Sequence, residues 1–200
     1  MDNRIVHLID DDEDVRRAVA FMLGTTGLAV RVYESASAFL AQDGRGLSGC
    51  IVSDVRMPGV DGLGLMRALK ERGQDIPVVI MTGHADVPLA VEAMKAGAVD
   101  FIEKPFTDDA MLAAVAVALG RAGTGRDSGL DDVRSRMASL TPREREVLDG
   151  LLAGHPNKTI ASDLGLSPRT VEVHRANVMT KMCASSLSEL VRQALLAGAS

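Results

Sequence analysis

The sequence predicts an α/β domain with a doubly wound, five-stranded parallel sheet, followed by a smaller domain made only of helices. Three observations favour this architecture. Short apolar runs alternate with helical patterns up to residue 120, a glycine-rich segment follows, and only helical patterns come after it. Because alternating strands and helices of this length form parallel sheets with right-handed crossovers, we expect the strand order 2-1-3-4-5.

The first domain contains five predicted strands, each followed by a predicted helix. Three of the strands are near-continuous β-branched runs, which is typical of strands buried on both faces. The strands are IVHLI (5–9), AVRVY (29–33), GCIVS (49–53), PVVIM (77–81) and VDFI (99–102). The helical patterns between and after them cover 13–24, 35–42, 62–72, 86–96 and 107–119.

The glycine-rich segment GRAGTGRDSG begins at Gly120 and has no apolar periodicity, so it is typical of a linker. We therefore divide the chain into a first domain (1–120), a linker that is partly helical (121–138) and a second domain (139–200). Four helices are predicted in the second domain, at 142–153, 157–164, 168–182 and 186–196.

Composition excludes several classes of protein. Hydrophobic residues make up 46% and charged residues 24% of the chain, which is the balance of an ordinary globular protein. No apolar run approaches the ~18 residues of a membrane span, and the N-terminus turns acidic where a signal peptide would stay apolar. The two cysteines, Cys50 and Cys183, lie far apart and fit a reducing compartment. We expect a cytoplasmic protein that does not associate with membranes.

Charge and aromatic content differ between the two halves. Residues 1–120 carry 18 acidic and 11 basic side chains, whereas residues 121–200 carry 9 acidic and 11 basic ones. The halves should therefore face different partners. All aromatic residues lie in the first half, so the second half offers no ring on which a nucleic-acid base could stack.

Polar side chains follow four of the predicted strands. Asp10 and Asp11 follow the first strand, Asp54 the third, Thr82 the fourth and Lys104 the fifth. Because the carboxyl ends of parallel strands share one edge of a sheet, we expect these groups to converge there. Clustered carboxylates repel unless a cation lies among them, and hard oxygen ligands suit Mg²⁺. A carboxylate beside Mg²⁺ with a lysine nearby is arranged to attack a phosphoryl group.

Each of these residues alone has a simpler explanation, because an aspartate after a strand is often a turn former or a helix N-cap. Thr82 alone would also be a cap. The joint pattern at the ends of four strands favours the functional interpretation.

The segments HLIDDDEDVR, VSDVRMPGVDG, PVVIMTGHAD and AGAVDFIEKPF resemble the four signatures of the bacterial response-regulator receiver domain. The resemblance implies that Asp54 is the phosphoacceptor, that Thr82 and Lys104 bind the phosphoryl group, and that Phe101 is the aromatic switch residue. The implied Mg²⁺ ligands are Asp10, Asp11, Asp54 and the carbonyl of Arg56. The family also implies a cis Lys104–Pro105 bond.

In the second domain, a turn at Leu164-Gly165-Leu166 joins two predicted helices, which is typical of a helix-turn-helix. At 100° per residue, Val171, Val178 and Met182 share the core side of the helix 168–182. The opposite side carries Arg169, Glu172, Val173, Ala176 and Thr180. Its small apolar residues suit a major groove, where Arg169 could contact either a guanine or a phosphate. The candidate phosphate contacts are Lys158, Thr170, Arg175 and Lys181.

The segments LTPREREVL, NKTIASDLGLSPRTVEVHR and SSLSELVRQAL resemble the four-helix LuxR/NarL output domain. Together with HADVPLAVEAMKAGAVDFIEKPF, they resemble the FixJ subfamily of two-component regulators. This resemblance implies a transcriptional regulator, not an enzyme, that a sensor histidine kinase phosphorylates at Asp54. It implies homodimerisation on phosphorylation, binding to double-stranded promoter DNA, contact with RNA polymerase, and nitrogen-fixation genes as targets.

Two other functions remain open from the residues. An aspartate-nucleophile phosphatase would use Asp54 for hydrolysis, but such enzymes carry a second acid two residues later, where this chain has Arg56. Alternatively, the helical domain could bind a protein or RNA, and the lack of aromatic residues argues against RNA.

Overall fold

The computed structural model describes residues 5–42, 47–83, 87–121 and 130–198 of the chain. The chain divides into two compact units, one formed by residues 1–84 and 96–125 and the other by residues 85–95 and 126–200. Of the predicted linker, residues 122–129 lie outside the described residues, and a helix begins at Leu130. The domain boundaries inferred from the sequence stay predictions.

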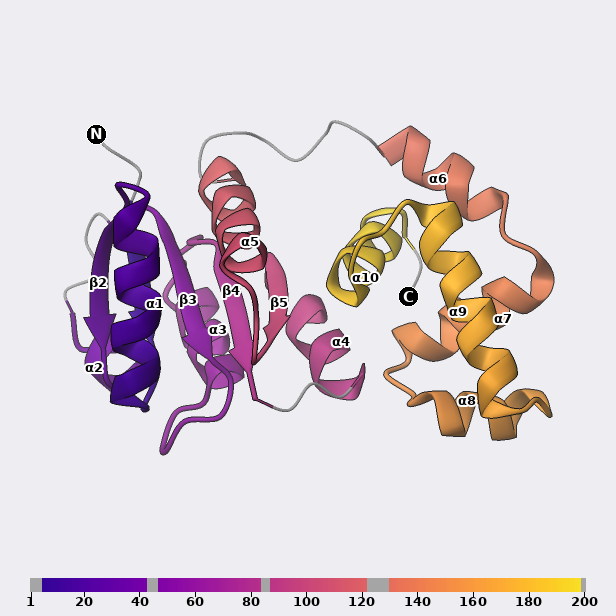
Figure 1. The fold of residues 1–200 in the computed structure, drawn as a ribbon, viewed down its shortest axis with the longest axis horizontal. Coiled ribbons are helices and arrows are strands. Elements are labelled where there is room, and N and C mark those ends of the chain that lie inside the picture. Colours follow the sequence, from indigo (N-terminus) through magenta and orange to yellow (C-terminus); the bar gives the residue numbers. More distant parts are fainter. Residues whose placement is uncertain (1–4, 43–46, 84–86, 122–129, 199–200) are drawn as a thin grey trace. The chain divides into compact units, whose positions relative to one another are not determined.

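The first unit contains a five-stranded parallel sheet in the order β2-β1-β3-β4-β5, which confirms the predicted fold class (Figure 1). Its strands are β1 (Ile5–Ile9), β2 (Ala29–Tyr33), β3 (Cys50–Asp54), β4 (Val78–Thr82) and β5 (Asp100–Glu103). The helices of this unit are α1 (Glu13–Thr25), α2 (Ala36–Leu40), α3 (Gly62–Glu71) and α5 (Asp108–Arg121), whereas α4 (Val87–Lys95) falls within the residues of the second unit. Helices α1 and α5 cover one face of the sheet and α3 lies on the opposite face (Figure 1).

The central strands are covered on both sides, as their apolar sequences predict. Every residue of β3 and β4 is buried, whereas the edge strand β2 is largely exposed. Strand β4 begins one residue later than predicted because Pro77 has no N–H to donate, although its carbonyl accepts from Ile51 at 2.8 Å. Asp54 and Thr82 are the last residues of β3 and β4, so the sheet itself fixes their main chains.

The second unit is helical. It contains α6 (Leu130–Ala138), α7 (Pro142–Leu152), α8 (Asn157–Leu164), α9 (Pro168–Met182) and α10 (Leu187–Leu196). The fully buried side chains of α7 and α9 pack in its core, and they include Val147, Leu148, Leu151, Val171, Val178 and Met182. Thr141 and Glu144 form a capping box at the start of α7, in which each side chain bonds the other residue's main-chain N–H.

Within the described ranges, the chain has no helix that is both long and apolar enough to cross a bilayer. Both cysteines are free thiols, with Cys50 buried on β3 and Cys183 exposed after α9. Burial raises the pKa of the Cys50 thiol to about 12, so this side chain stays neutral and acts as a small apolar residue.

A buried histidine on β1, His7, contacts β2 and the segment before β3 through its two ring nitrogens. His7 Nε2 lies 3.2 Å from the Ser48 carbonyl, and Nδ1 lies 3.2 Å from the Tyr33 hydroxyl. Because a carbonyl can only accept, Nε2 carries the proton and Nδ1 accepts from the hydroxyl. Burial lowers the pKa of His7, and the charge of Arg31 lowers it further, against the opposite effect of the Ser48 bond.

We expect His7 to destabilise the first unit in acid. Since the pKa of His7 is lower in the folded state than in the unfolded state, its stabilising contribution is complete above about pH 6.5 and is lost as the pH falls through the folded-state pKa. Urea unfolding followed by the fluorescence of Tyr33, the single tyrosine, should show a smaller loss of stability between pH 7.5 and 5 in His7→Gln than in wild type. Parallel pH profiles would contradict this assignment.

Candidate functional site

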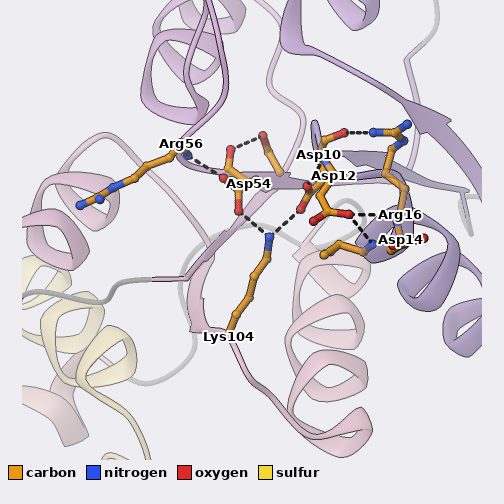
Figure 2. A network of polar contacts seen from close by, with 9 residues as sticks. Asp10, Asp12, Asp14, Arg16, Asp54, Arg56 and Lys104 are labelled. Carbon is orange, nitrogen blue, oxygen red and sulfur yellow. Dashed lines mark hydrogen bonds and ion pairs between the residues drawn. The ribbon is translucent and has the colours of Figure 1, made fainter.

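Three charged side chains meet at the carboxyl edge of the sheet. Asp10 directly follows β1, Asp54 ends β3, and Lys104 directly follows β5. Lys104 Nζ lies 2.6 Å from Asp10 Oδ2 and 2.6 Å from Asp54 Oδ1, so one ammonium bridges two carboxylates (Figure 2). Both aspartates are more than 90% buried. The strand ends thus bring together three of the residues that the sequence predicted at this edge.

The second oxygen of each aspartate accepts a main-chain N–H. The Asp12 amide donates to Asp10 Oδ1 at 2.9 Å, and the Arg56 amide donates to Asp54 Oδ2 at 2.7 Å. The side chain of Arg56 is exposed and extends away from the carboxylates (Figure 2). Arg56 therefore contacts Asp54 through its backbone. The resemblance to receiver domains likewise implied a role for the backbone of Arg56, as a carbonyl ligand of Mg²⁺.

The shared ammonium changes the proton affinities of its partners. Burial raises the pKa of Asp10, and the charge of Asp54 adds to this effect, whereas the bonds from Lys104 and the Asp12 amide oppose it. Burial alone would lower the pKa of Lys104, but its hydrogen bonds to the two carboxylates and their charges outweigh burial and raise it. The lysine therefore stays charged, and the cluster of three groups carries a net negative charge.

The remaining predicted residues of this site lie around these three. Thr82 is fully buried at the end of β4, and its carbonyl accepts from the Lys104 amide at 2.6 Å. Phe101 is half-buried on β5, opposite Ile80. Asp11 is exposed. The Lys104–Pro105 peptide bond is cis, as the resemblance to receiver domains implied.

No group of three or more acidic, histidine or cysteine side chains in the described part of the chain is arranged to hold a metal. Two carboxylates share an ammonium, and the third, Asp11, points to solvent. The donor chemistry nevertheless fits Mg²⁺, because Asp10, Asp11 and Asp54 supply hard oxygen ligands and their charge exceeds that of Lys104. The metal site stays a prediction.

Gly62, which the sequence analysis did not single out, constrains the backbone of Asp54. A Cβ atom at residue 62 would lie 2.6 Å from the Asp54 carbonyl oxygen and 3.0 Å from Val55 Cα. Both are main-chain atoms that no side-chain rotation can move. The Gly62 amide also donates to the Val55 carbonyl at 3.0 Å. Only glycine lets α3 begin this close to the end of β3. In the sequence, the only sign of this constraint is that a glycine stands at the start of a predicted helix.

The helix-turn-helix lies in the second unit. Gly165 ends α8 in the left-handed conformation with φ 65°, and Ser167 caps α9, where its Oγ accepts from the Thr170 amide at 3.1 Å. Val171, Val178 and Met182 are fully buried, whereas Arg169, Glu172 and Ala176 are exposed. The core and outer sides of α9 are therefore the ones that the helical-wheel argument predicted.

The outer side of α9 has the properties of a binding surface. Val173 is 55% exposed although it is apolar, and Thr180 is exposed on the same side of the helix, about two turns later. Asn177 is exposed as well, and the sequence analysis missed it because its wheel angle lies at the margin of this side. Its amide can donate and accept hydrogen bonds, which suits base edges.

The four candidate phosphate contacts have different surroundings. Lys158 is exposed, and Arg175 is half-buried. The Thr170 hydroxyl lies 2.8 Å from Ser167 Oγ within the N-cap of α9. Lys181 Nζ lies 2.7 Å from Glu144 Oε2 and 3.3 Å from the Ser139 carbonyl, so this ammonium already has partners inside the unit. The bond from Lys181, together with that from the Thr141 amide, lowers the pKa of Glu144.

Comparisons with known proteins assign both parts of the chain to families. The family described as response regulator receiver domain matches residues 6–116, and the luxR family of bacterial regulatory proteins matches residues 138–194. The chain therefore belongs to the two-component response regulators that join a receiver domain to a LuxR-type DNA-binding domain. Among them it is a member of the FixJ-type transcriptional regulators, because relatives of that name match it over nearly their whole length.

The FixJ transcriptional regulatory protein of Azorhizobium caulinodans is 60% identical over 96% of this chain and 92% of its own length. That of Rhizobium meliloti is 51% identical over 99% of this chain and 98% of its own. The crystal structure of full-length FixJ from B. japonicum aligns with a TM-score of 0.57 and 52% identity, and covers 97% of each chain.

Removing the shared ammonium should destabilise the first unit. In Lys104→Gln, two buried carboxylates lose their counter-charge, and breaking such a pair costs about 3 kcal/mol at pH 7. The loss should shrink toward pH 5, because the pKa of Asp10 is already raised and a protonated Asp10 needs no counter-charge. Urea unfolding measures both effects, with Lys70→Gln on the exposed side of α3 as the control. A variant as stable as wild type at pH 7 would contradict the bridging geometry.

Proposed function

We propose that Asp54 accepts a phosphoryl group from a sensor histidine kinase and that this promotes homodimerisation and sequence-specific binding to promoter DNA. The observation that carries the proposal is the position of the Lys104 ammonium, which lies 2.6 Å from both Asp10 and Asp54 at the carboxyl edge of the sheet. A phosphoryl group on Asp54 would need a cation at this position, and Lys104 is already there.

The transfer step follows from these contacts. An oxygen of Asp54 attacks the phosphorus atom, the bond from phosphorus to the kinase imidazole breaks, and an acyl phosphate forms. The charge at residue 54 then changes from one negative charge to about two, with new strong acceptor oxygens. Lys104 can follow this charge, since its ammonium has three donors and needs only a small movement to reach a phosphoryl oxygen. Thr82, at the end of the adjacent strand, supplies a hydroxyl for a second oxygen.

Magnesium would be held by Asp10, Asp11, Asp54 and the carbonyl of Arg56. When bound, Mg²⁺ neutralises phosphoryl charge and orients the reacting oxygens. Asp10 is positioned for this role by the Asp12 amide, and Asp54 by the Arg56 amide. Asp11 adds an exposed carboxylate in the adjacent position of the chain.

We propose that the phosphoryl signal reaches the face of β5 that carries Phe101, a half-buried residue three positions before Lys104. A threonine that moves toward the phosphoryl group leaves space into which this ring can turn.

We further propose that the protein acts in the cytoplasm, that it contacts RNA polymerase at its promoters, and that it has no enzymatic substrate of its own. Arg56 stands where a phosphatase of the aspartate-nucleophile class would carry an acid.

Asp54→Asn should abolish the response to a phosphodonor. With acetyl phosphate and Mg²⁺, wild type should gain one phosphoryl group, dimerise and bind DNA more tightly, whereas Asp54→Asn should do none of these. Mass spectrometry, light scattering and gel shift measure the three steps. Asp75→Asn, an exposed aspartate in the segment before β4, should respond as wild type does. Equal responses from Asp54→Asn and wild type would refute the assignment.

The exposed side of α9 should determine which sequence is bound. We propose that Arg169, Glu172, Val173 and Ala176 face the bases and that Lys158, Thr170, Arg175 and Lys181 contact phosphates. Arg169→Ala should weaken binding to sites selected by wild type from random duplexes by about 1–3 kcal/mol and relax the preference at one base pair. A uniform loss over all sequences with a reduced salt slope would instead make Arg169 a phosphate contact. Arg143→Ala, on the exposed side of α7, is the matched control.

A further inference from the structure

An arginine on α1 holds the main chain of the acidic loop. Arg16 lies one turn inside α1, and its Nη1 donates to the carbonyl oxygen of Asp10 at 2.6 Å (Figure 2). Arg16 is only partly exposed. A charged donor at this distance makes a stronger bond than a neutral amide would. Arg17, the next residue, instead pairs with Glu13 on the exposed side of the helix. Of the two arginines, only Arg16 is bonded to the Asp10 main chain.

The carbonyl that Arg16 holds belongs to the peptide between Asp10 and Asp11. This peptide lies beyond the last β1–β3 pair, Ile9 with Ser53, and follows the Asp10 amide, which still donates to the Tyr33 carbonyl of β2. Because a peptide unit is planar, fixing its oxygen fixes the plane, and with it the direction in which the backbone enters Asp11. The Asp10 amide donates to the Tyr33 carbonyl, and its two carboxylate oxygens accept from the Asp12 amide and from Lys104. With the bond from Arg16 to its carbonyl oxygen, every polar atom of Asp10 has a partner.

We propose that Arg16 is a positioning residue for the divalent cation: it orients the Asp10–Asp11 peptide so that both carboxylates can face one ion. The inference rests on the proposed function of the acidic site formed by Asp10, Asp11 and Asp54, and deepens it. It also makes a prediction opposite in sign to simple electrostatics. If only charge mattered, removing the positive charge of Arg16 near the acidic site should strengthen cation binding. If Arg16 orients the peptide, its removal should weaken cation binding.

The test compares three variants of the full chain: Arg16→Gln, Arg16→Lys and, as the matched control, Arg17→Gln. Mg²⁺ affinity is measured without any phosphodonor, from the rise in melting temperature and from Tyr33 fluorescence. Tyr33 is the single tyrosine, and its carbonyl accepts from the Asp10 amide at 3.3 Å. We expect Mg²⁺ binding about tenfold weaker in Arg16→Gln, in the range found when ligand-orienting residues are lost. Arg16→Lys should recover part of the affinity, and Arg17→Gln should bind as wild type does.

Phosphorylation by acetyl phosphate separates this inference from the proposed function. Arg16→Gln should reach the wild-type level once Mg²⁺ is saturating, whereas Asp54→Asn should not accept a phosphoryl group at any Mg²⁺ concentration. Unchanged or tighter Mg²⁺ binding in Arg16→Gln would overturn the positioning role while leaving the phosphoacceptor intact. Wild type that binds Mg²⁺ but accepts no phosphoryl group would overturn the proposed function alone. If Arg16→Gln fails to fold, judged by its melting curve in chelator, the comparison of Arg16→Lys with Arg17→Gln decides, and equal affinities would overturn the inference.

Discussion

The bridge from Lys104 to Asp10 and Asp54 is the constraint on which the rest of the first unit depends. Two carboxylates buried at the ends of adjacent strands would repel each other strongly without a counter-charge. Lys104 supplies that charge from β5, two strands away from β3, and its own amide is bonded to the Thr82 carbonyl. Any anion or cation that binds beside Asp10 and Asp54 must therefore compete with, or rearrange, contacts of this single ammonium.

Parallel-sheet geometry explains why the edge could be predicted from sequence. Asp10, Asp54, Thr82 and Lys104 each end or follow an apolar run, and the strand order places all four runs side by side. The direction of each side chain could not be predicted in the same way. Asp11 is exposed because the chain turns there into α1, where Asp12 becomes the N-cap and accepts from the Asp14 amide at 2.8 Å. That turn depends on local hydrogen bonds, including the one from Arg16, that strand patterns do not encode.

The same limit applies to α9. Helical periodicity correctly separated the buried Val171, Val178 and Met182 from the exposed outer side, because that separation depends only on the angle around the helix axis. Lys181 lies at the flank, where the angle alone cannot determine its partner. In the structure its ammonium bonds Glu144, 37 residues earlier in the chain, and this contact depends on how α7 packs against α9. A basic residue at the flank of α9 can thus stabilise the fold.

The two lysine–carboxylate contacts differ in how much they can change. In both, a main-chain amide bonds the same carboxylate as the lysine: Arg56 for Asp54 and Thr141 for Glu144. Lys104 has two carboxylate partners, so it can leave Asp54 for a new anion and still keep Asp10. Lys181 has one, and without it the buried Glu144 of the capping box would lose its counter-charge. Lys104 can therefore bind a new anion without leaving Asp10 unpaired, whereas Lys181 can contact a phosphate only with donors that its bond to Glu144 leaves over.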